Sequence, residues 1–294
     1  MSQLAFHAPE TIDQALALLA GDPGARVLAG GTDLIVQMRS GRVAPSAVID
    51  LKRIAGLGGV RALPGGGFAI GAATPCTALK DDAALAAAWP GVVEAANLIG
   101  SVQVRNRATV AGNLCNASPA ADSVPALVAA GAIAVIAGPQ GQRETPVEQI
   151  PLAPGRTSLQ PGEFLVEIRL PARAAGEADA YLRSIPRTEM DIAVVGAGVS
   201  LALGPDGTCT AARIALGAVA PTVLLVEAAG AALVGTRLDD AALAAMADAV
   251  RAACRPIDDK RGTAGYRTAM AGVLVRRTVA IARQRAAGPA GEKA

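Results

Sequence analysis

Hydrophobic and polar positions in the first third of the chain follow the periods of short helices and strands. Thr11 and Gln14 have the spacing of a capping box, which predicts the start of a helix. The apolar side of this helix consists of four residues, Ile12, Ala15, Leu16 and Leu19. The apolar run 26–29 ends at two glycines and predicts a strand, followed by a helix over 33–39 and a second strand over 48–51. This order is typical of a small βαβ unit.

The middle of the chain opens with a glycine-rich boundary. Residues 57–67 contain five glycines and a proline, which predicts turns between two parts of the fold. We expect the elements after it to be a strand at 68–70, alanine-rich helices up to 99, a second strand–turn pattern at 109–113, a helix over 122–130 and a strand over 133–137.

Beyond Pro171 the pattern changes. Residues 173–179 are small and polar, like a linker, and two apolar runs joined by a Gly-Pro-Asp-Gly turn predict a hairpin of strands 192–203 and 211–218. Helices are expected over 223–233, 239–254 and 263–283. Strands followed by helices indicate a separate α+β domain. We therefore expect three parts, covering residues 1–57, 58–172 and 173–294.

Composition narrows the class of protein. With 52% apolar and 18% charged residues, the 294-residue chain is an ordinary folded protein with a core of Ala, Val, Leu and Ile. A net charge of +2 gives no electrostatic case for nucleic acid or an anionic membrane. The uncharged stretch 123–142 contains prolines and glycines and predicts a buried helix and strand, so we expect no membrane insertion. Without a signal-peptide pattern at its start, the chain is expected to be cytoplasmic.

The scarcity of histidine and the spacing of cysteine exclude several kinds of site. A catalytic triad or a multi-histidine metal site would depend on the single histidine, His7, which we expect to be a surface or loop residue. The four cysteines are far apart in sequence, so no metal or iron–sulfur ligand cluster is expected, and buried free thiols are the favoured state. These are Cys76, Cys115, Cys209 and Cys254.

Two glycine-containing turns are candidate phosphate sites. In the first, the strand at 26–29 runs into Gly30-Gly31-Thr32 and a helix start, where glycines admit a ligand close to the backbone and helix amides favour an anion. The second spans 101–122 and is rich in amide and hydroxyl side chains. A tight turn with a capping Thr32, and a loop that satisfies its own backbone, are the alternatives. Together the turns fit one ligand with two phosphates, and a dinucleotide is the economical choice. The GxG at 196–198 is expected to be two glycines within a strand and not a nucleotide-binding motif.

Several segments resemble one family in order and spacing across nearly the whole chain. They are AGGTDL at 29–34, QVRNRATVAGN at 103–113, ASPAAD at 117–122, GEFLVEIRLP at 162–171, RTEMDIAVVGAGVSL at 187–201 and KRGTAGYR at 260–267. These segments are similar to the FAD-binding medium subunits of molybdenum hydroxylases, the relatives of xanthine dehydrogenase and aerobic carbon monoxide dehydrogenase. The resemblance implies an α+β fold with a two-part PCMH-type FAD-binding domain and a smaller C-terminal α+β domain.

The resemblance also implies a role inside a larger complex. A large partner subunit would hold the molybdenum cofactor and a small one two 2Fe-2S clusters, in a dimer of heterotrimers. Electrons would pass from the clusters through noncovalent FAD to an external acceptor. The sequence lacks ligand sets for molybdenum or iron–sulfur centres, which fits this division. The alternatives are a stand-alone FAD oxidoreductase of the same general fold and a scaffold subunit without flavin.

Carried over position by position, the resemblance implies a set of flavin-binding residues. The first pyrophosphate loop corresponds to Val27, Leu28, Ala29, Gly30, Gly31, Thr32, Asp33 and Leu34, and the second to Thr109, Val110, Ala111, Gly112 and Asn113. Residues beside the flavin would be Ile99, Gly100, Asp122, Leu165 and Arg183. Without the resemblance, Asp122 reads as a helix N-cap, Leu165 as a strand core residue and Arg183 as a solvated strand residue. No catalytic side chain is implied.

Two departures from the family pattern concern the flavin site. Ala111 replaces a glycine, and its methyl group is tolerable only if the residue needs neither a positive φ nor the closest approach to the ligand. Arg183 stands where many relatives have Lys, which keeps the positive charge but changes the shape of the group.

Overall fold

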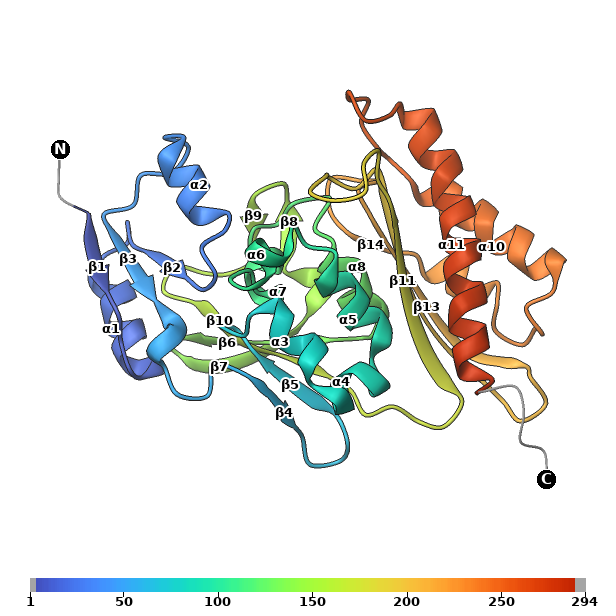
Figure 1. Ribbon diagram of the computed structural model, residues 1–294, viewed down its shortest axis with the longest axis horizontal. Helices are drawn as coiled ribbons and strands as arrows, with labels where there is room; N and C mark the ends of the chain where they lie inside the picture. The colour runs from blue at the N-terminus through green and yellow to red at the C-terminus, as the bar shows by residue number, and fades with distance from the viewer. Residues whose placement is uncertain (1–3, 289–294) are drawn as a thin grey trace.

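The chain forms β-sheets with helices packed between and outside them, as Figure 1 shows from the N-terminal side at the left to the C-terminal side at the right. The structure is a computed structural model and describes residues 4–288. The first sheet is parallel, with strand order β1-β3-β2. Its elements, with the adjoining helices, are β1 (Ala5–His7), α1 (Ile12–Gly21), β2 (Arg26–Leu28), α2 (Leu34–Arg39), β3 (Ala47–Asp50) and the 3-10 turn η1 (Leu51–Arg53).

The second sheet is antiparallel, with strand order β4-β5-β10-β6-β7. Its strands are β4 (Val60–Ala62), β5 (Phe68–Gly71), β6 (Ile133–Gly138), β7 (Gly141–Pro146) and β10 (Phe164–Leu170). A two-stranded hairpin of β8 (Pro151–Ala153) and β9 (Arg156–Thr157) follows the turn η2 (Val147–Gln149). Helix α1 packs against both sheets, and one apolar cluster joins α1, β3, β6 and β10.

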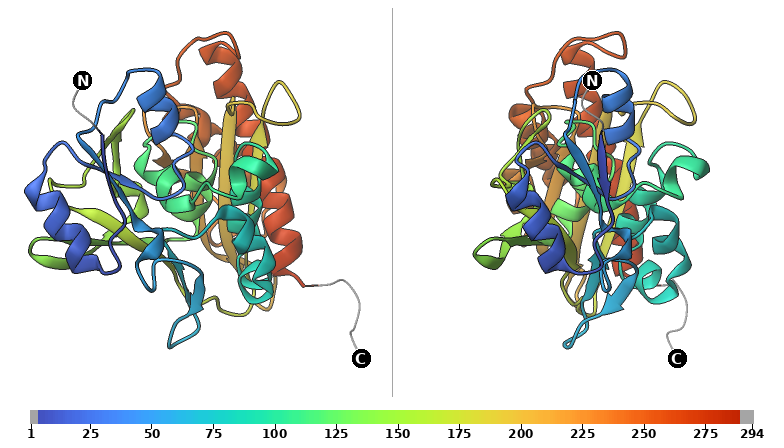
Figure 2. Two further views of the ribbon diagram at one scale, coloured as in Figure 1. Left: turned by 60° about the vertical axis from the view of Figure 1, so that its left-hand side comes forward. Right: turned by 90° about the vertical axis from the view of Figure 1, so that its left-hand side faces the viewer.

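Six short helices fill the space between the second sheet and the C-terminal one, and the views of Figures 1 and 2 agree on this. They are α3 (Cys76–Asp81), α4 (Ala83–Ala88), α5 (Pro90–Asn97), α6 (Val102–Arg105), α7 (Val110–Cys115) and α8 (Ser123–Ala129). Their core is built from Ala, Val, Leu and Ile and includes the single tryptophan, Trp89.

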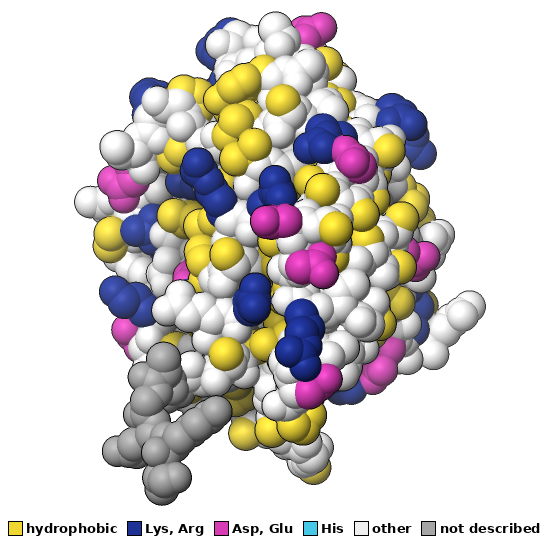
Figure 3. Space-filling model, turned by 90° about the vertical axis from the view of Figure 1, so that its right-hand side faces the viewer, with side chains coloured by type: hydrophobic (Ala, Val, Ile, Leu, Met, Phe, Trp, Pro, Cys, Tyr) yellow, Lys and Arg dark blue, Asp and Glu magenta, His cyan; other side chains and the backbone are white. Residues whose placement is uncertain are grey.

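The C-terminal sheet is antiparallel, with strand order β11-β12-β13-β14. Its elements are β11 (Glu177–Ser184), β12 (Val195–Leu203), β13 (Cys209–Gly217), β14 (Leu224–Leu225), α9 (Glu227–Ala231), α10 (Asp240–Ala253) and α11 (Ala264–Ala286). Helices α10 and α11 cover its outer face, and α5 and α8 meet its inner face. Over the outer helices, acidic and basic side chains are intermixed with apolar ones (Figure 3).

Most predicted elements are confirmed, including the α+β class, the capped first helix and the hairpin at 204–207. Three expectations are wrong. The segment expected as a helix over 223–233 begins with the short strand β14, and only 227–231 are helical. The expected linker 173–179 ends inside β11, where Asp179 is buried. The expected strand–turn at 109–113 is the first part of α7. Between residues 4 and 288, no helix has the length and hydrophobicity to cross a bilayer.

Candidate functional site

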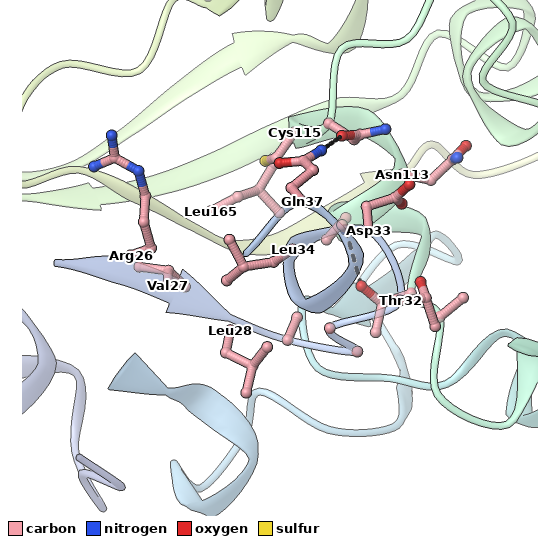
Figure 4. A pocket seen from close by; sticks show the side chains of 18 of the residues that line it. Arg26, Val27, Leu28, Thr32, Asp33, Leu34, Gln37, Asn113, Cys115 and Leu165 are labelled. Atoms are coloured by element: carbon pink, nitrogen blue, oxygen red, sulfur yellow. Dashed lines mark hydrogen bonds between the residues drawn. The ribbon is translucent and has the colours of Figure 1, made fainter. Parts of the chain in front are cut away.

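A cleft of about 910 Å³ opens between the first sheet and the layer of short helices. The turn from β2 into α2 forms one wall, and the start of α7 forms the other. Strand β10 contributes the buried side chain of Leu165, and Pro154 and Gly155 from the turn of the small hairpin line the cleft together with Leu159. Figure 4 shows Leu28, Thr32, Leu34, Asn113 and Leu165 around this space.

The two glycine turns touch each other beside this cleft. A Cβ atom on Gly30 would overlap the backbone of Arg107 and Ala108, the residues that lead directly into Thr109. The second turn therefore passes so close to Gly30 that only a residue without a side chain fits there. Gly31 adopts a φ of +79°, a conformation that side chains rarely adopt. The first turn thus requires both of its glycines for backbone reasons.

The second turn is helical because its hydroxyl residues cap helices. The Thr109 hydroxyl accepts the N–H of Gly112 at 2.8 Å and starts α7, while Ser101 starts α6 in the same way. The β-branched residues in this segment favoured a strand in the sequence, but the two caps decide the local structure. Ala111 lies inside α7 without a positive φ, which meets the first of the two conditions for its methyl group.

The surface of the second turn that faces the cleft is open at Gly112. A Cβ there would have only the Thr109 hydroxyl within 4 Å, at 3.0 Å. Beside it, the Asn113 side-chain carbonyl accepts the N–H and the hydroxyl of Ser123, at 3.2 and 2.7 Å. Asn113 thereby ties the turn to the start of α8.

The first turn offers backbone donors to the cleft. Within residues 4–288, the N–H groups of Thr32 and Asp33 have no hydrogen-bond acceptor. Burial raises the pKa of the Asp33 carboxyl group, which caps no backbone N–H of α2. On the other side of the turn, Lys52 Nζ donates to the carbonyl of Ala29 at 3.1 Å. Free N–H groups on a glycine turn are the donors that a phosphate oxygen needs.

At its inner end, the cleft is bordered by Ile99. The next residue, Gly100, has a φ of +54° and starts the turn into α6. Arg105 Nη1 donates to the carbonyls of Ile99 and Gly100, both at 3.2 Å, and so fixes this bend. The chain segment between α5 and α6 is therefore held at the cleft by a side chain of α6.

Asp122 and Arg183 form a buried ion pair. Arg183 Nη1 lies 2.7 Å from Asp122 Oδ2, and the Tyr181 hydroxyl lies 3.4 Å from Oδ1. Burial raises the pKa of Asp122 to about 6, although Arg183 and Tyr181 act in the opposite direction. Asp122 precedes α8 but caps no N–H of it, and Arg183 is buried rather than solvated, so both alternatives to a site role are wrong. Arg183 Nε is buried and has no acceptor within residues 4–288.

The structure brings most of the predicted site residues to one cleft. Those that line it are Val27, Leu28, Ala29, Gly30, Gly31, Thr32, Asp33, Leu34, Ile99, Thr109, Ala111, Gly112, Asn113 and Leu165. Those outside the lining are Gly100, Val110, Asp122 and Arg183. Val110 is fully buried in the core, so its side chain supports α7 and does not face the cleft.

Sequence reasoning missed a polar bridge over the cleft. Gln37 Nε2 of α2 donates at 2.9 Å to Oδ1 of Asn116, the residue that follows α7, and both residues line the cleft; Gln37 is labelled in Figure 4. Gln37 follows the first motif by one helical turn, and Asn116 lies inside the second, within 101–122. Nothing in a single sequence indicates that these two amides meet, because the hydrogen bond joins segments 79 residues apart.

The chemistry of the lining suits binding better than covalent catalysis. Cys115 faces the cleft, but burial raises the pKa of its thiol to about 12, so it stays protonated and unreactive. In the described part of the chain, no three His, Cys, Asp or Glu side chains are grouped as for a metal ion. The neutral amide and hydroxyl side chains of the lining and the backbone N–H groups of its glycine turns are hydrogen-bonding groups that fit a dinucleotide such as FAD.

Comparison with protein families covers both parts of the chain. Residues 2–173 match the family described as the FAD binding domain in molybdopterin dehydrogenase. Residues 180–282 match the CO dehydrogenase flavoprotein C-terminal domain. The chain is 38% identical over 284 residues to the carbon monoxide dehydrogenase medium chain of Hydrogenophaga pseudoflava, with 96% of this chain and 98% of that one covered. It is 29% identical to a putative xanthine dehydrogenase FAD-binding subunit of Escherichia coli K12, covering 96% and 97% of the two chains.

Solved structures show the same fold. A chain of carbon monoxide dehydrogenase from Hydrogenophaga pseudoflava superimposes with a TM-score of 0.92 at 39% identity, covering 96% of this chain and 98% of that chain. A chain of quinoline 2-oxidoreductase from Pseudomonas putida 86 gives a TM-score of 0.89 at 28% identity, with coverage of 97% and 98%.

Proposed function

The chain belongs to the family of FAD-binding medium subunits of molybdenum hydroxylases, and from this premise we propose that it transfers electrons within such a complex. Bound FAD would supply a redox carrier that takes electrons from 2Fe-2S clusters of a small partner subunit and passes them to an external acceptor. The protein's own task is to bind this cofactor noncovalently, orient it and keep its surroundings fixed. The family membership makes the chain an oxidoreductase subunit.

The observation that carries the proposal is the meeting of two glycine turns on one cleft. The first offers the free N–H groups of Thr32 and Asp33, and the second leaves open space at Gly112. We assign the diphosphate to the part of the cleft that both turns line, where backbone donors can approach it closely. Leu165 would pack against the flavin, as Ile99 would from the inner end of the cleft.

The ion pair of Asp122 and Arg183 would adjoin the flavin. Arg183 Nε is a buried donor that lacks an acceptor among residues 4–288, and an unsatisfied buried donor is costly without a partner. A flavin carbonyl or ring nitrogen is an acceptor of the right kind. The positive charge of Arg183 would stabilise the electron density that reduction adds to the flavin ring.

The proposed partners follow from the family. The similar carbon monoxide dehydrogenase chain is named a medium chain. We propose a large subunit with the molybdenum cofactor, a small subunit with two 2Fe-2S clusters, a dimer of heterotrimers and a cytoplasmic location. We also propose that residues 1–57 and 58–172 are the two parts of the FAD-binding domain and that residues 173–294 are the C-terminal domain.

Replacing Gly112 tests the site. Gly112→Leu places a side chain into the cleft, so FAD should be lost. Because the added Cβ lies 3.0 Å from the Thr109 hydroxyl that caps α7, far-ultraviolet circular dichroism must show that the helix content equals that of wild type. Gly21→Leu is the matched control, because Gly21 is also helical, has nothing within 4 Å of an added Cβ and does not line the cleft. Flavin absorbance of the purified variants measures the result. Full flavin content in Gly112→Leu would contradict the proposal.

Purification under mild conditions separates the alternative functions. A chain that co-purifies with one larger and one smaller partner and releases FAD on denaturation supports the electron-transfer subunit. A stand-alone FAD oxidoreductase would be a flavin-containing single chain with turnover on its own substrate. A scaffold subunit would co-purify with partners but release no FAD on denaturation, even after incubation with FAD.

A further inference from the structure

Helix α5 has no cap of its own. Its N-cap position is occupied by Trp89, whose side chain accepts no N–H, and its first residue is Pro90. The missing acceptor comes from strand β11, where Asp179 Oδ2 accepts the N–H of Val92 at 3.1 Å across 87 residues of sequence. Burial raises the pKa of Asp179, whereas the N–H groups of Gly91 and Val92 and the charge of Arg173 favour its charged form. Asp179 therefore caps α5 from the C-terminal domain.

The capping carboxylate is fixed from its other side. Arg173 Nη2 lies 2.9 Å from Asp179 Oδ1, and the guanidinium carbon lies 3.7 Å from the centroid of the Trp89 ring. Both side chains of this ion pair are buried. Within residues 4–288, none of the Arg173 guanidinium nitrogens has a hydrogen-bond partner and neither has Asp179 Oδ1, so charge attraction and stacking on Trp89 hold the arginine beside the carboxylate.

The contact between α5 and β11 depends on a glycine and is reinforced by Glu94. A Cβ on Gly91 would lie 2.5 Å from Asp179 Oδ2 and 2.8 Å from the Cα of Ala180. One turn along α5, Glu94 accepts the N–H of Tyr181 at 3.3 Å and pairs with Arg285 of α11. The helix and the strand are thus in direct backbone contact.

Helix α5 leads directly into the cleft, because it ends at Asn97 and the chain continues to Ile99 and Gly100. The same face of β11 carries Arg183, which pairs with Asp122. We propose that Asp179 is a positioning residue for the bound flavin: by capping α5, it fixes the helix that leads to Ile99, the residue that lines the cleft two positions after the helix ends. This inference rests on the proposed function.

A pair of glycine variants tests this positioning. Gly91→Ala adds a methyl group that must push Asp179 and β11 away from α5, although alanine favours the helix itself. We expect the dissociation constant of FAD to rise about tenfold. The control is Gly265→Ala, at the same second position of helix α11, where an added Cβ has nothing within 4 Å. Its FAD affinity should stay within about twofold of wild type.

The visible circular dichroism of the bound flavin separates positioning from a general loss of stability. At saturating FAD, Gly91→Ala should give an altered flavin spectrum, and Gly265→Ala the wild-type spectrum. Wild-type affinity and spectrum in Gly91→Ala would overturn this inference alone. A wild-type chain that takes up no FAD would overturn the proposed function and this inference with it.

A second set of variants tests the carboxylate directly and serves if Gly91→Ala fails to fold. Asp179→Ala removes the cap and should weaken FAD binding about tenfold, whereas Asp179→Asn keeps an acceptor oxygen and should restore most of the affinity. Asp239→Ala removes the N-cap of α10, which does not lead into the cleft, and should leave the flavin spectrum unchanged. Equal FAD binding by Asp179→Ala and Asp239→Ala would overturn the proposal.

Discussion

The two faces of the C-terminal sheet are built on different principles. The outer face presents Val195, Val199 and Leu201 of β12 to α10 and α11, in a core made almost entirely of Ala, Val and Leu. The inner face of β11 presents Asp179, Tyr181 and Arg183, and each engages a group of the FAD-binding part. Apolar contacts are nondirectional, whereas ion pairs and caps fix positions. The outer face therefore supplies stability, and the inner face supplies alignment.

Glycines on the inner face allow this alignment. A Cβ on Gly198 would overlap the carbonyl of Pro125 in α8, and one on Gly217 would lie 2.9 Å from the Pro125 ring. A Cβ on Gly196 would lie 2.7 Å from the Tyr181 hydroxyl. The absence of side chains at Gly196 and Gly198 thus lets the Tyr181 hydroxyl and helix α8 lie close to the sheet. Its interpretation as a strand pair, and not as a nucleotide motif, agrees with its place in β12.

Truncating the outer face should produce the largest loss of stability. Leu201 is buried in the outer core, so Leu201→Ala should cost about 2–5 kcal/mol of unfolding free energy through lost burial and a cavity. Urea denaturation measures this loss. Because the outer face is not expected to place the flavin, the visible circular dichroism of the FAD-saturated variant should equal that of wild type. A changed flavin spectrum would break the distinction between the faces.

The ion pair on the inner face should give a pH dependence of intermediate size. Because the pKa of Asp122 is raised to about 6, the folded chain keeps a proton that the unfolded chain releases above about pH 4. The proton on Asp122 contributes at most about 3 kcal/mol to the free energy of unfolding. This contribution is fully present below about pH 4 and is lost as the pH rises through about 6. Asp122→Asn should remove this part of the dependence of the unfolding free energy on pH. Unfolding free energies of the wild type and of Asp122→Asn at pH 4.5 and 6.5 measure this dependence. An equal change between the two pH values in both proteins would refute the assignment to Asp122.

Local signals in the sequence were sufficient for most of the fold. The cap at Thr11, the apolar periods of α10 and α11 and the turn at 204–207 act within a few residues, and each predicted its element. The segment 109–113 was misread because β-branched residues suggest a strand while Thr109 caps a helix. There, one hydrogen bond outweighs intrinsic propensity.

The site was predictable only where a contiguous motif carries it. The turns at 29–34 and 109–113 were identified as motifs, and the structure places both on one cleft. The bridge from Gln37 to Asn116 and the cap on α5 by Asp179 join segments 79 and 87 residues apart. Asp179 lay in a segment whose small polar residues suggested a linker. Its burial follows from the docking of β11 on α5, which no local pattern contains.

Of the two tyrosines in the chain, only Tyr181 lies on the inner face, and its hydroxyl should make a small contribution to stability. Tyr181→Phe removes a hydroxyl that lies 3.4 Å from Asp122, whereas Tyr266→Phe changes an exposed residue of α11. So long a hydrogen bond is weak, and its loss should cost less than about 1 kcal/mol. The hydroxyl favours the charged carboxylate, so its removal should raise the pKa of Asp122 further and extend the pH-dependent loss of stability to higher pH. Stability profiles of both variants between pH 4 and 8 measure this shift. If Tyr181→Phe and Tyr266→Phe give the same profile, the phenol belongs to packing, and alignment on the inner face rests on Asp179 and Arg183 alone.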